Sequence, residues 1–395
     1  MAEAVIVDII RTASGRGKPG GVLSATHPVD LLASVLEALV QRNDLDPALV
    51  DDVIGGCVGQ AAEQSLNITR SAVLAAGFPD SVPGTMVDRQ CGSSQQAVHF
   101  AAQGVAAGAY DIVIACGVES MSRVPMGTAV MGEDAWGPKL RARYSEGLVG
   151  QGVSAELIAA KWKLDRETLD EFSARSHQRA HASAEHFLRE IVPIDVQTPT
   201  GETVRHTVDE TVRASTTIEG LGGLKPSFED AEMAARFPEA QWIITPGNSS
   251  PLTDGASAAL IMSADKAEQL GLTPRARFRA FAVAGDDPIF MLTAPIPATH
   301  KILDRSGLSI DDIDAYEVNE AFAPVPLAWA REFNADLDRL NPRGGAIALG
   351  HPLGASGIRL MATLLNHLEA TGGRLGLQTM CEGAGMANAT IIERI

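Results

Sequence analysis

The chain has 395 residues, of which 45% are hydrophobic and 21% are charged, and its formal net charge is −17. This length exceeds one ordinary hydrophobic core and predicts two domains of roughly 150 to 200 residues each, while the composition excludes a disordered chain. The negative charge and the lack of a basic stripe argue against nucleic acid as a partner. Any anionic substrate must therefore be met by locally placed Arg or Lys side chains.

Residues 1–10 predict a first β-strand rather than a signal peptide, because no basic leader precedes a long apolar stretch. No run in the sequence approaches the ~18 apolar residues of a membrane span. The four cysteines, Cys57, Cys91, Cys116 and Cys381, are too few and too scattered to predict a disulfide framework. These features favour a cytoplasmic protein that does not enter a membrane.

Short β-branched segments alternate with alanine- and leucine-rich helical stretches at both ends of the chain. Continuous apolar runs separated by helices predict strands that are buried on both faces of a mostly parallel sheet. We expect these strands at Ala4–Ile9, Asp52–Ile54, Ile112–Cys116, Ala276–Val283, Ile313–Val318, Gly376–Met380 and Ala389–Glu393.

The two ends of the chain also resemble each other, which predicts a duplicated α/β unit. Residues 45–56 and 308–319 share a pattern that leads into a strand and a turn, and Gly56 is matched to Asn319 in this alignment. We expect the two copies to pack against each other.

Later in each copy, a turn opens a helix that is followed by a strand. The turn at Cys91 precedes the strand that ends at Cys116, and the turn at His351 precedes the strand that ends near Cys381. Cys116 is therefore interpreted as the counterpart of Cys381.

Between the two copies the pattern loosens over residues 122–248. An insertion of this length, with secondary structure of its own, is usually functional, such as a lid or a substrate-binding excursion. We therefore divide the chain into an N-terminal core half at 1–121, completed by 249–270, a substrate-binding insertion at 122–248, and a C-terminal core half at 271–395.

Cys91 lies where a strand-like segment runs into a helix. The helix dipole favours the thiolate at such a position and lowers the pKa of the thiol. A thiol whose pKa falls near neutral can also serve as a base, unlike an ordinary thiol. A lone cysteine is more often a small buried hydrophobic residue, and Cys57 and Cys116, which close apolar runs, are interpreted in that way.

Three further residues have unusual surroundings. His351 follows a glycine and Cys381 precedes a glycine-rich segment, and such small neighbours leave room for a ligand beside the reactive atom. Asn319 follows a buried strand and must find a hydrogen-bond partner, either as a turn cap or by holding a water or a carbonyl group. Two cysteines and one histidine in this setting predict acyl chemistry through a thioester.

Four motifs occur in order along the chain: DRQCGSSQQAV, VNEAFA, GGAIALGHPLGASG and CEGAGMANATIIERI. Together with IVDIIRTASGRG and TPGNSSPLTDGASAAL, they make the chain resemble the thiolase family over nearly its whole length. The segments around Cys91 and at the C-terminus are most similar to thiolases of actinobacterial lipid and steroid catabolism. The resemblance implies two similar mixed-sheet α/β domains that form a layered αβαβα arrangement with an inserted loop domain.

The resemblance also implies a role for each matched residue. Cys91 matches the nucleophile that becomes acylated, and His351 matches the residue that activates this thiol and later donates to the thioester oxygen. Cys381 matches the acid/base that moves the proton on the substrate α-carbon or on the CoA thiol. Asn319 matches the residue that fixes a water in one oxyanion hole. The backbone N–H groups of Cys91 and Gly383 match a second oxyanion hole.

Coenzyme A and acyl-CoA are the substrates that the resemblance implies, with no tightly bound cofactor and no metal. Ser250 matches a serine beside the pantetheine arm, and Arg213 matches a residue that contacts the adenine-nucleotide end of CoA. The implied enzyme is an acetyl-CoA C-acyltransferase that forms a homodimer or a homotetramer. Val153 replaces a pocket histidine of some biosynthetic thiolases, so acyl-chain length stays open, as do the direction and the oligomeric state.

Three other interpretations were weighed. A β-ketoacyl synthase also uses a reactive cysteine in a duplicated α/β fold, but it has histidine or asparagine where this chain has Cys381. A non-catalytic thiolase-like protein that binds CoA or lipid typically lacks one catalytic residue, whereas all four are present here. A metal site built from Cys91, His351 and Cys381 lacks the paired short spacings of structural zinc sites.

Overall fold

The computed structural model describes residues 2–197 and 201–395, so Met1 of the predicted first strand and residues 198–200 of the insertion lie outside the described residues. The described chain contains an eleven-stranded mixed sheet. Nine of its strands follow one another in the order β11 (Ala315–Val318), β12 (Leu375–Glu382), β13 (Met386–Arg394), β10 (Ala276–Gly285), β1 (Ala4–Thr12), β9 (Thr253–Ser263), β5 (Ile112–Ser120), β3 (Asp52–Gly56) and β4 (Gly84–Val87). The short strands β2 (Gly15–Arg16) and β6 (Ile191–Val192) pair with β9 and β1.

All seven predicted strands are present, but the prediction of a mostly parallel sheet was wrong. The pairs β11–β12, β5–β3 and β3–β4 are parallel. The five pairs from β12 across the centre of the sheet to β5 are antiparallel. Continuous apolar runs report burial on both faces of a strand, and burial does not depend on the direction of the neighbouring strand.

The duplication is visible as a constant displacement along the chain. An interval of 263 residues separates Gly56 at the end of β3 from Asn319 after β11. The same interval separates Ser93 from Ser356, which are the first residues of α3 (Ser93–Ala106) and α14 (Ser356–Thr371). The two copies therefore keep the same register from their first matched strand to the central helix.

The pairing register corrects the expected counterpart of Cys381. In the N-terminal half Gly55 pairs with Cys116, and in the C-terminal half the equivalent Val318 pairs with Thr379. Cys116 therefore corresponds to Thr379 and not to Cys381. The prediction was wrong because it aligned the ends of two apolar runs, whereas β5 and β12 both continue beyond those ends.

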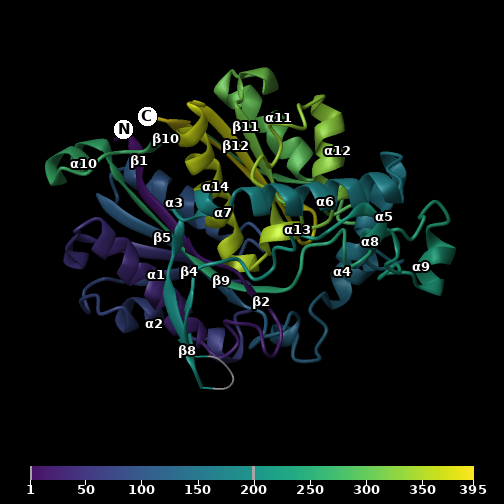
Figure 1. Ribbon diagram of the computed structural model, residues 1–395, viewed down its shortest axis with the longest axis horizontal. Helices are drawn as coiled ribbons and strands as arrows, with labels where there is room; N and C mark the ends of the chain where they lie inside the picture. The colour runs from purple at the N-terminus through teal and green to yellow at the C-terminus, as the bar shows by residue number, and fades with distance from the viewer. Residues whose placement is uncertain (1, 198–200) are drawn as a thin grey trace.

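Helices cover the sheet in layers (Figure 1). The outer face of the N-terminal half packs against α1 (Pro28–Arg42) and α2 (Ile68–Ala75). The outer face of the C-terminal half packs against α11 (Pro295–Ser306) and α12 (Pro324–Phe333). Between the two halves, α3 and α14 pack together in a third apolar cluster, which produces the expected αβαβα arrangement.

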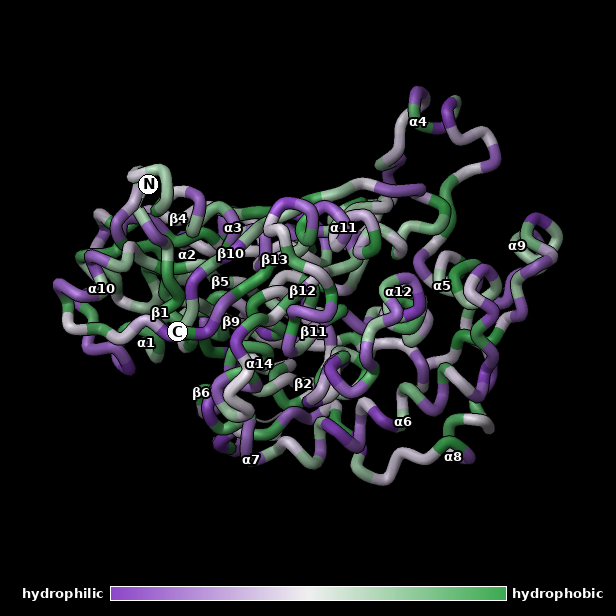
Figure 2. Tube along the Cα trace, turned by 90° about the horizontal axis from the view of Figure 1, so that it is seen from above, coloured by the Kyte–Doolittle hydropathy of each residue, from purple (hydrophilic) through white to green (hydrophobic). Residues whose placement is uncertain are grey.

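The remaining elements lie mostly between β5 and β9 in the chain. Among them, the segment with α4 projects away from the body of the molecule (Figure 2). These elements are η1 (Pro47–Leu49), η2 (Ala62–Gln64), η3 (Thr128–Val130), α4 (Gly137–Arg143), α5 (Gln151–Lys161), α6 (Arg166–Ala182), α7 (Ala184–Phe187), β7 (Ile194–Gln197), β8 (Thr203–His206), α8 (Ile218–Gly222), α9 (Ala231–Arg236), α10 (Ala264–Leu270), η4 (Ile310–Asp312), α13 (Ala346–Leu349) and η5 (Leu353–Ala355). In the described part of the chain, no helix has the length and apolar character needed to cross a bilayer.

Candidate active site

Cys91 is placed by a tight turn between β4 and α3. Gln90 has a φ of 49°, in the left-handed region that non-glycine residues rarely adopt. The turn is held by a hydrogen bond of 2.7 Å from the Gln90 amide to the Asp88 carboxylate. Cys91 itself is 3% exposed and immediately precedes Gly92, the N-cap of α3. A strained residue next to a buried thiol is typical of a functional site.

His351 lies in a loop whose hydrogen bonds determine the tautomer of its ring. Gly350 has a φ of 83°, and the His351 amide donates to Thr253 Oγ1 at 3.0 Å. His351 Nδ1 lies 2.6 Å from Ser356 Oγ, which itself donates to the carbonyl oxygen of Pro352 at 2.8 Å. Because the hydroxyl hydrogen is used in that second bond, Nδ1 carries the ring proton and Nε2 is left as an acceptor.

Asn319 and Cys381 meet His351 at the carboxyl ends of the parallel strands β11 and β12. Asn319 Nδ2 lies 3.3 Å from His351 Nε2 and 3.9 Å from Cys381 Sγ. All three side chains are buried. Asn319 Oδ1 has no hydrogen-bond partner among the described residues, which leaves an acceptor free for a small polar ligand such as water.

Two adjoining cavities open on this cluster. A cavity of about 430 Å³ is bordered by His351, and a second cavity of about 420 Å³ is bordered by Cys91. Leu353 packs against Cys91 and lines both cavities. The residues shared by the two linings are Met121, Met126, Gln151 and Leu353. The thiol and the imidazole therefore face one continuous region of the surface.

Burial controls the protonation of the site. Burial raises the pKa of Cys91 well above its usual value, and the nearby Cys381 and Glu382 raise this pKa further. Burial also raises the pKa of Cys381 to about 12 and lowers the pKa of His351 to about 3, with Arg359 adding to the latter shift. The expected lowering of the Cys91 pKa was therefore wrong, because loss of hydration outweighs the helix dipole at a side chain with so little exposure.

Glu320, which holds the segment of chain that leads to His351, was not identified from the sequence. Its buried carboxylate accepts hydrogen bonds from Asn341 Nδ2 at 2.9 Å, from Ser176 Oγ at 2.7 Å and from the Ile347 amide at 3.1 Å. These contacts tie α6 and α13 to the end of β11. The available signal was the acidic residue directly after Asn319 at the end of a buried strand.

Glu119 was also missed, although it links the two halves. Its carboxylate accepts from the amides of Val58, Gly59 and Gly354 at 2.9 to 3.0 Å and from Gln64 Nε2 at 2.8 Å. Gly354 belongs to the loop that follows His351. The N-terminal half therefore anchors the histidine loop of the C-terminal half through one buried acid.

The two residues expected to bind CoA lie on neighbouring hollows. Ser250 lines the cavity that His351 borders, together with Pro251 and Leu252. Arg213 is exposed and lines a separate hollow of about 400 Å³, which Pro251 and Leu252 also border. The same hollow contains the side chains of Lys18, Arg16 and Glu210, of which the last two form an ion pair. A hollow with two cationic residues that pair with no described carboxylate, Arg213 and Lys18, therefore shares Pro251 and Leu252 with the cavity that His351 borders.

Gly383, expected to supply a backbone donor, lies in the turn between β12 and β13. A Cβ atom at this position would lie 2.9 Å from Gln90 Oε1. Gly383 therefore lies against the side chain of Gln90, the residue before Cys91, on the turn that is expected to supply the other donor of the second oxyanion hole.

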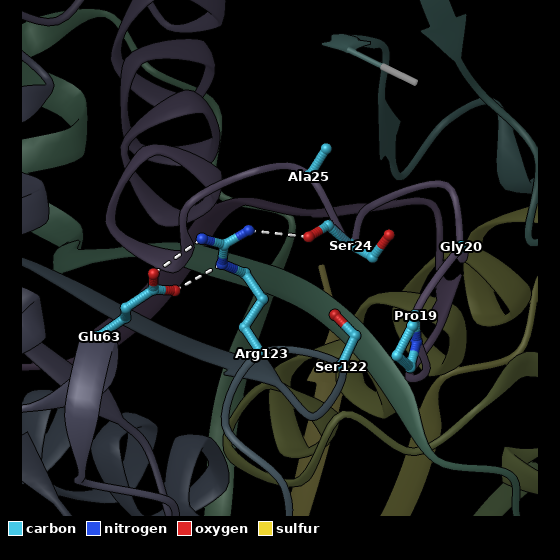
Figure 3. Close-up of a pocket in the computed structure, with 7 residues that line it drawn as sticks. All are labelled: Pro19, Gly20, Ser24, Ala25, Glu63, Ser122 and Arg123. Carbon is cyan, nitrogen blue, oxygen red and sulfur yellow. Dashed lines mark hydrogen bonds and ion pairs between the residues drawn. The ribbon is translucent and has the colours of Figure 1, made fainter. Parts of the chain in front are cut away.

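A further hollow of about 420 Å³ is lined by a different set of residues (Figure 3). Its charged lining residues are Arg123 and Glu63, which form an ion pair at 2.5 Å, and Arg123 also donates to the carbonyl oxygen of Ser24 at 2.8 Å. Neither a thiol nor an imidazole lines it. Within residues 2–197 and 201–395, no group of three or more His, Cys, Asp or Glu side chains is arranged to hold a metal ion.

Comparison with known proteins agrees with this geometry. The thiolase N-terminal domain matches residues 4–265 and the thiolase C-terminal domain matches residues 272–394. A steroid 3-ketoacyl-CoA thiolase of Mycobacterium tuberculosis is 47% identical over 100% of this chain and 95% of its own length, and a 3-ketoacyl-CoA thiolase of Idiomarina loihiensis is 46% identical over 100% of both. The crystal structure of the Bacillus anthracis acetyl-CoA acetyltransferase superposes with a TM-score of 0.88 at 36% identity, covering 100% of this chain and 99% of that one. The chain therefore belongs to the thiolase family.

Proposed function

We propose that this protein is an acetyl-CoA C-acyltransferase that cleaves 3-oxoacyl-CoA with free CoA through an acyl-Cys91 intermediate. In the reverse direction it condenses two molecules of acetyl-CoA. The observation that carries the proposal is that Asn319 lies within hydrogen-bond reach of both His351 and Cys381, while His351 borders a cavity that adjoins the one bordered by Cys91.

The first half-reaction uses thiols that are neutral at rest. As Cys91 Sγ attacks the C3 carbonyl carbon of the substrate, its proton moves to His351 Nε2, which the tautomer leaves free to accept it. The C2–C3 bond then breaks, and its electron pair becomes the enolate of acetyl-CoA. The thiol of Cys381 donates its proton to C2, so acetyl-CoA leaves while the shortened acyl group stays on Cys91.

The second half-reaction restores every proton. The Cys381 thiolate takes the proton of the incoming CoA thiol, and the CoA sulfur attacks the acyl-Cys91 thioester. Cys91 leaves as a thiolate and regains its proton from His351. One thioester replaces another of similar energy, so the transfer is reversible.

Backbone and side-chain donors stabilise the oxyanions that form in both steps. The free Oδ1 of Asn319 supports its proposed role in fixing a water that donates to the enolate oxygen. The contact between the Cys91 turn and Gly383 supports a second hole, in which the two N–H groups donate to the tetrahedral intermediate. One such donor typically contributes about 10²–10³ in rate.

CoA is proposed to enter along the segment that joins the two hollows. Its phosphates would meet Arg213, and its pantetheine arm would pass Pro251 and Leu252 to reach Ser250. This route resolves the conflict between an anionic substrate and a chain with a net charge of −17. Coenzyme A acts here as a substrate, and no resident cofactor takes part in the proposed steps.

The cellular setting and the assembly are part of the same proposal. We place the enzyme in the cytoplasm, because its four cysteines are free and scattered through the chain. A homodimer or homotetramer is supported by exposed apolar side chains on and near the projecting segment, namely Met126, Met131 and Trp136. We divide the chain at 1–121 with 249–270, 122–248 and 271–395, and the boundary between the two family matches at residues 265–272 supports the last of these divisions.

The test is the location of the acyl group. The protein is incubated with an acyl-CoA, digested, and analysed by peptide mass spectrometry, and we expect the acyl mass on the peptide that contains Cys91. Cys91→Ala should lose both the adduct and turnover. Cys116→Ala, which changes a core cysteine away from the site, should keep the adduct. An adduct on Cys381 or Cys57 in the unaltered protein would contradict the proposal.

A further inference from the structure

Glu382, the last residue of β12, is a buried carboxyl group with little described support. Its side chain is fully buried, and neither carboxyl oxygen accepts a hydrogen bond of good geometry from a described residue, although the backbone amide of Asn388 lies close enough to lower its pKa. An ionised carboxylate in such a place would lose its hydration with little compensation, at a cost of several kcal/mol. A group of this kind calls for a specific explanation.

The surroundings of Gly92 locate a partner for Glu382. A Cβ atom on Gly92 would lie 2.1 Å from Glu382 Oε1 and 2.8 Å from Asn388 Oδ1. Both distances start from the same Cβ position, so Glu382 Oε1 and Asn388 Oδ1 lie at most 4.9 Å apart. Asn388 Oδ1 is likewise buried without a described donor. Two buried acceptors in the same neighbourhood can satisfy each other if the carboxyl group carries a proton and donates it.

The orientation of the Asn388 amide is determined by its other end. Asn388 Nδ2 donates to the carbonyl oxygen of Gly92 at 2.9 Å. Rotating the amide by half a turn would place Oδ1 against that carbonyl, so Oδ1 is the amide atom left without a described donor. The result is a chain of contacts from Glu382 through Asn388 to the backbone of Gly92, the residue that follows Cys91.

We propose that Glu382 is a positioning residue for the thiolase reaction, whose neutral carboxyl group, acting through Asn388, holds the Cys91 turn against the loop that carries Gly383. This inference rests on the proposed function, which places the N–H groups of Cys91 and Gly383 in one oxyanion hole. Glu382 immediately precedes Gly383, and its side chain reaches the residue after Cys91. The separation of the two donors therefore depends on this contact.

The charges around Glu382 agree with a neutral acid. The groups that face it are Arg89 and Asp88 on the turn and the thiols of Cys91 and Cys381. Burial raises the pKa of Glu382 to about 9, Arg89 and the backbone amide of Asn388 oppose the shift, and Asp88 adds to it. Ionisation would place a negative charge beside the Cys91 thiolate that forms during turnover, and it would remove the proton that joins Glu382 to Asn388.

Two substitutions of Glu382 distinguish the effect of its donated proton from the effect of its size. Glu382→Gln keeps a neutral hydrogen-bond donor of nearly the same size, whereas Glu382→Leu removes the donor. We expect the unaltered protein to lose activity at high pH with a midpoint near pH 9. We expect Glu382→Gln to keep kcat within about threefold near pH 7 and to show no such loss. We expect Glu382→Leu to lower kcat by about tenfold or more with little change in KM, because an oxyanion contact acts in the transition state.

The assay is steady-state thiolysis of a 3-oxoacyl-CoA between pH 6 and 10, with acylation of Cys91 followed in parallel by mass spectrometry. A Glu382→Gln variant as impaired as Glu382→Leu, or one with an unchanged alkaline decline, overturns the inference. Full kcat in Glu382→Leu overturns it as well. If Glu382→Leu does not fold, the pH profile of Glu382→Gln decides. Absence of acyl-Cys91 in the unaltered protein refutes the proposed function and this inference together, whereas normal acylation with unaffected Glu382 variants refutes the inference alone.

Discussion

Glu119 and Glu382 occupy equivalent positions in the two halves of the molecule, yet their surroundings are opposite. They are separated by the same 263 residues as the other matched positions, and each lies at or next to the end of a central strand. Glu119 accepts hydrogen bonds from three backbone amides and from Gln64, whereas neither oxygen of Glu382 accepts one of good geometry from a described residue. Burial raises the pKa of both acids, but four donors oppose the rise at Glu119 and only Arg89 and the backbone amide of Asn388 oppose it at Glu382.

The same asymmetry explains why a duplicated fold contains one thiol cluster. Asn319 and Cys381 correspond to Gly56 and Val118, which bring no polar side chain to the N-terminal copy. A Cβ atom on Gly56 would lie 2.8 Å from the carbonyl oxygen of Gly354, in the loop that follows the histidine. The strand end of the N-terminal half is therefore occupied by the histidine loop of the C-terminal half, and the single site forms where they meet.

The largest effect is expected from substituting Cys381, which lies at the strand end of the C-terminal half. Cys381→Ala should lower turnover by about 10²–10⁴-fold, because the enolate loses its proton donor. Acylation of Cys91 should continue and appear as a burst without turnover. The matched control is Val118→Ala at the equivalent position, which should change kcat only a few-fold. Undiminished thiolysis by Cys381→Ala would favour a synthase-like mechanism.

Asn319→Ala tests the neighbouring strand end. We expect kcat for C–C cleavage to fall by about 10²–10³-fold, because the free Oδ1 no longer holds a donor for the enolate oxygen. Single-turnover experiments that separate acylation from cleavage are the appropriate measurement. Equal losses in binding and in kcat would show that Asn319 supports the fold through its contact with His351 instead.

The two acids should respond differently to pH and to substitution by glutamine. Because Glu382 holds its proton in the fold up to about pH 9 and loses it near 4.3 when unfolded, the stability from this group is present at low pH and is lost as pH rises. The free energy of unfolding should fall by up to about 1.4 kcal/mol per pH unit across this interval. Glu382→Gln should remove that slope, as measured by denaturant unfolding from pH 5 to 8.5.

Glu119→Gln is the matched variant for this comparison. It would turn an amide N–H₂ group toward backbone N–H donors and should cost about 1–3 kcal/mol at neutral pH. Unfolding curves of the two variants under the same conditions sharpen the contrast. Equal behaviour of the two variants at every pH would show that the halves do not differ in the way that their hydrogen bonds indicate.

The smallest effect concerns the exposed Arg213. Arg213→Ala should raise KM for CoA substrates several-fold with little change in kcat, because remote binding is lost equally in the ground and transition states. The effect should shrink at high salt and vanish for pantetheine thioesters that lack the nucleotide. Arg205→Ala, an exposed arginine paired with Asp195 in the same insertion, is the control. A similar loss with the truncated substrates would assign Arg213 to the fold rather than to phosphate binding.

The sequence by itself determined the positions of seven strands and the residues of the candidate site, but it did not predict β9, and it indicated β4 only as a strand-like segment before Cys91. Apolar runs predict buried strands from local composition alone. The glycines around His351 and Cys381 indicate that a ligand and the backbone approach these side chains closely. The four motifs named Cys91, His351, Asn319 and Cys381 before their proximity was visible. These features depend on residues that are neighbours in the sequence, so they can be predicted from the sequence alone.

Tertiary structure decided the direction of the central strands, the protonation of the thiols and the roles of the buried acids. A strand that is buried on both faces has the same composition whether its neighbour runs parallel or antiparallel. The pKa of Cys91 depends on how completely distant segments exclude water from it, not on the helix that follows it. Glu119 and Glu382 are both glutamates after a β-strand sequence, and only the groups packed around each one decide whether its carboxyl finds donors or must keep its proton.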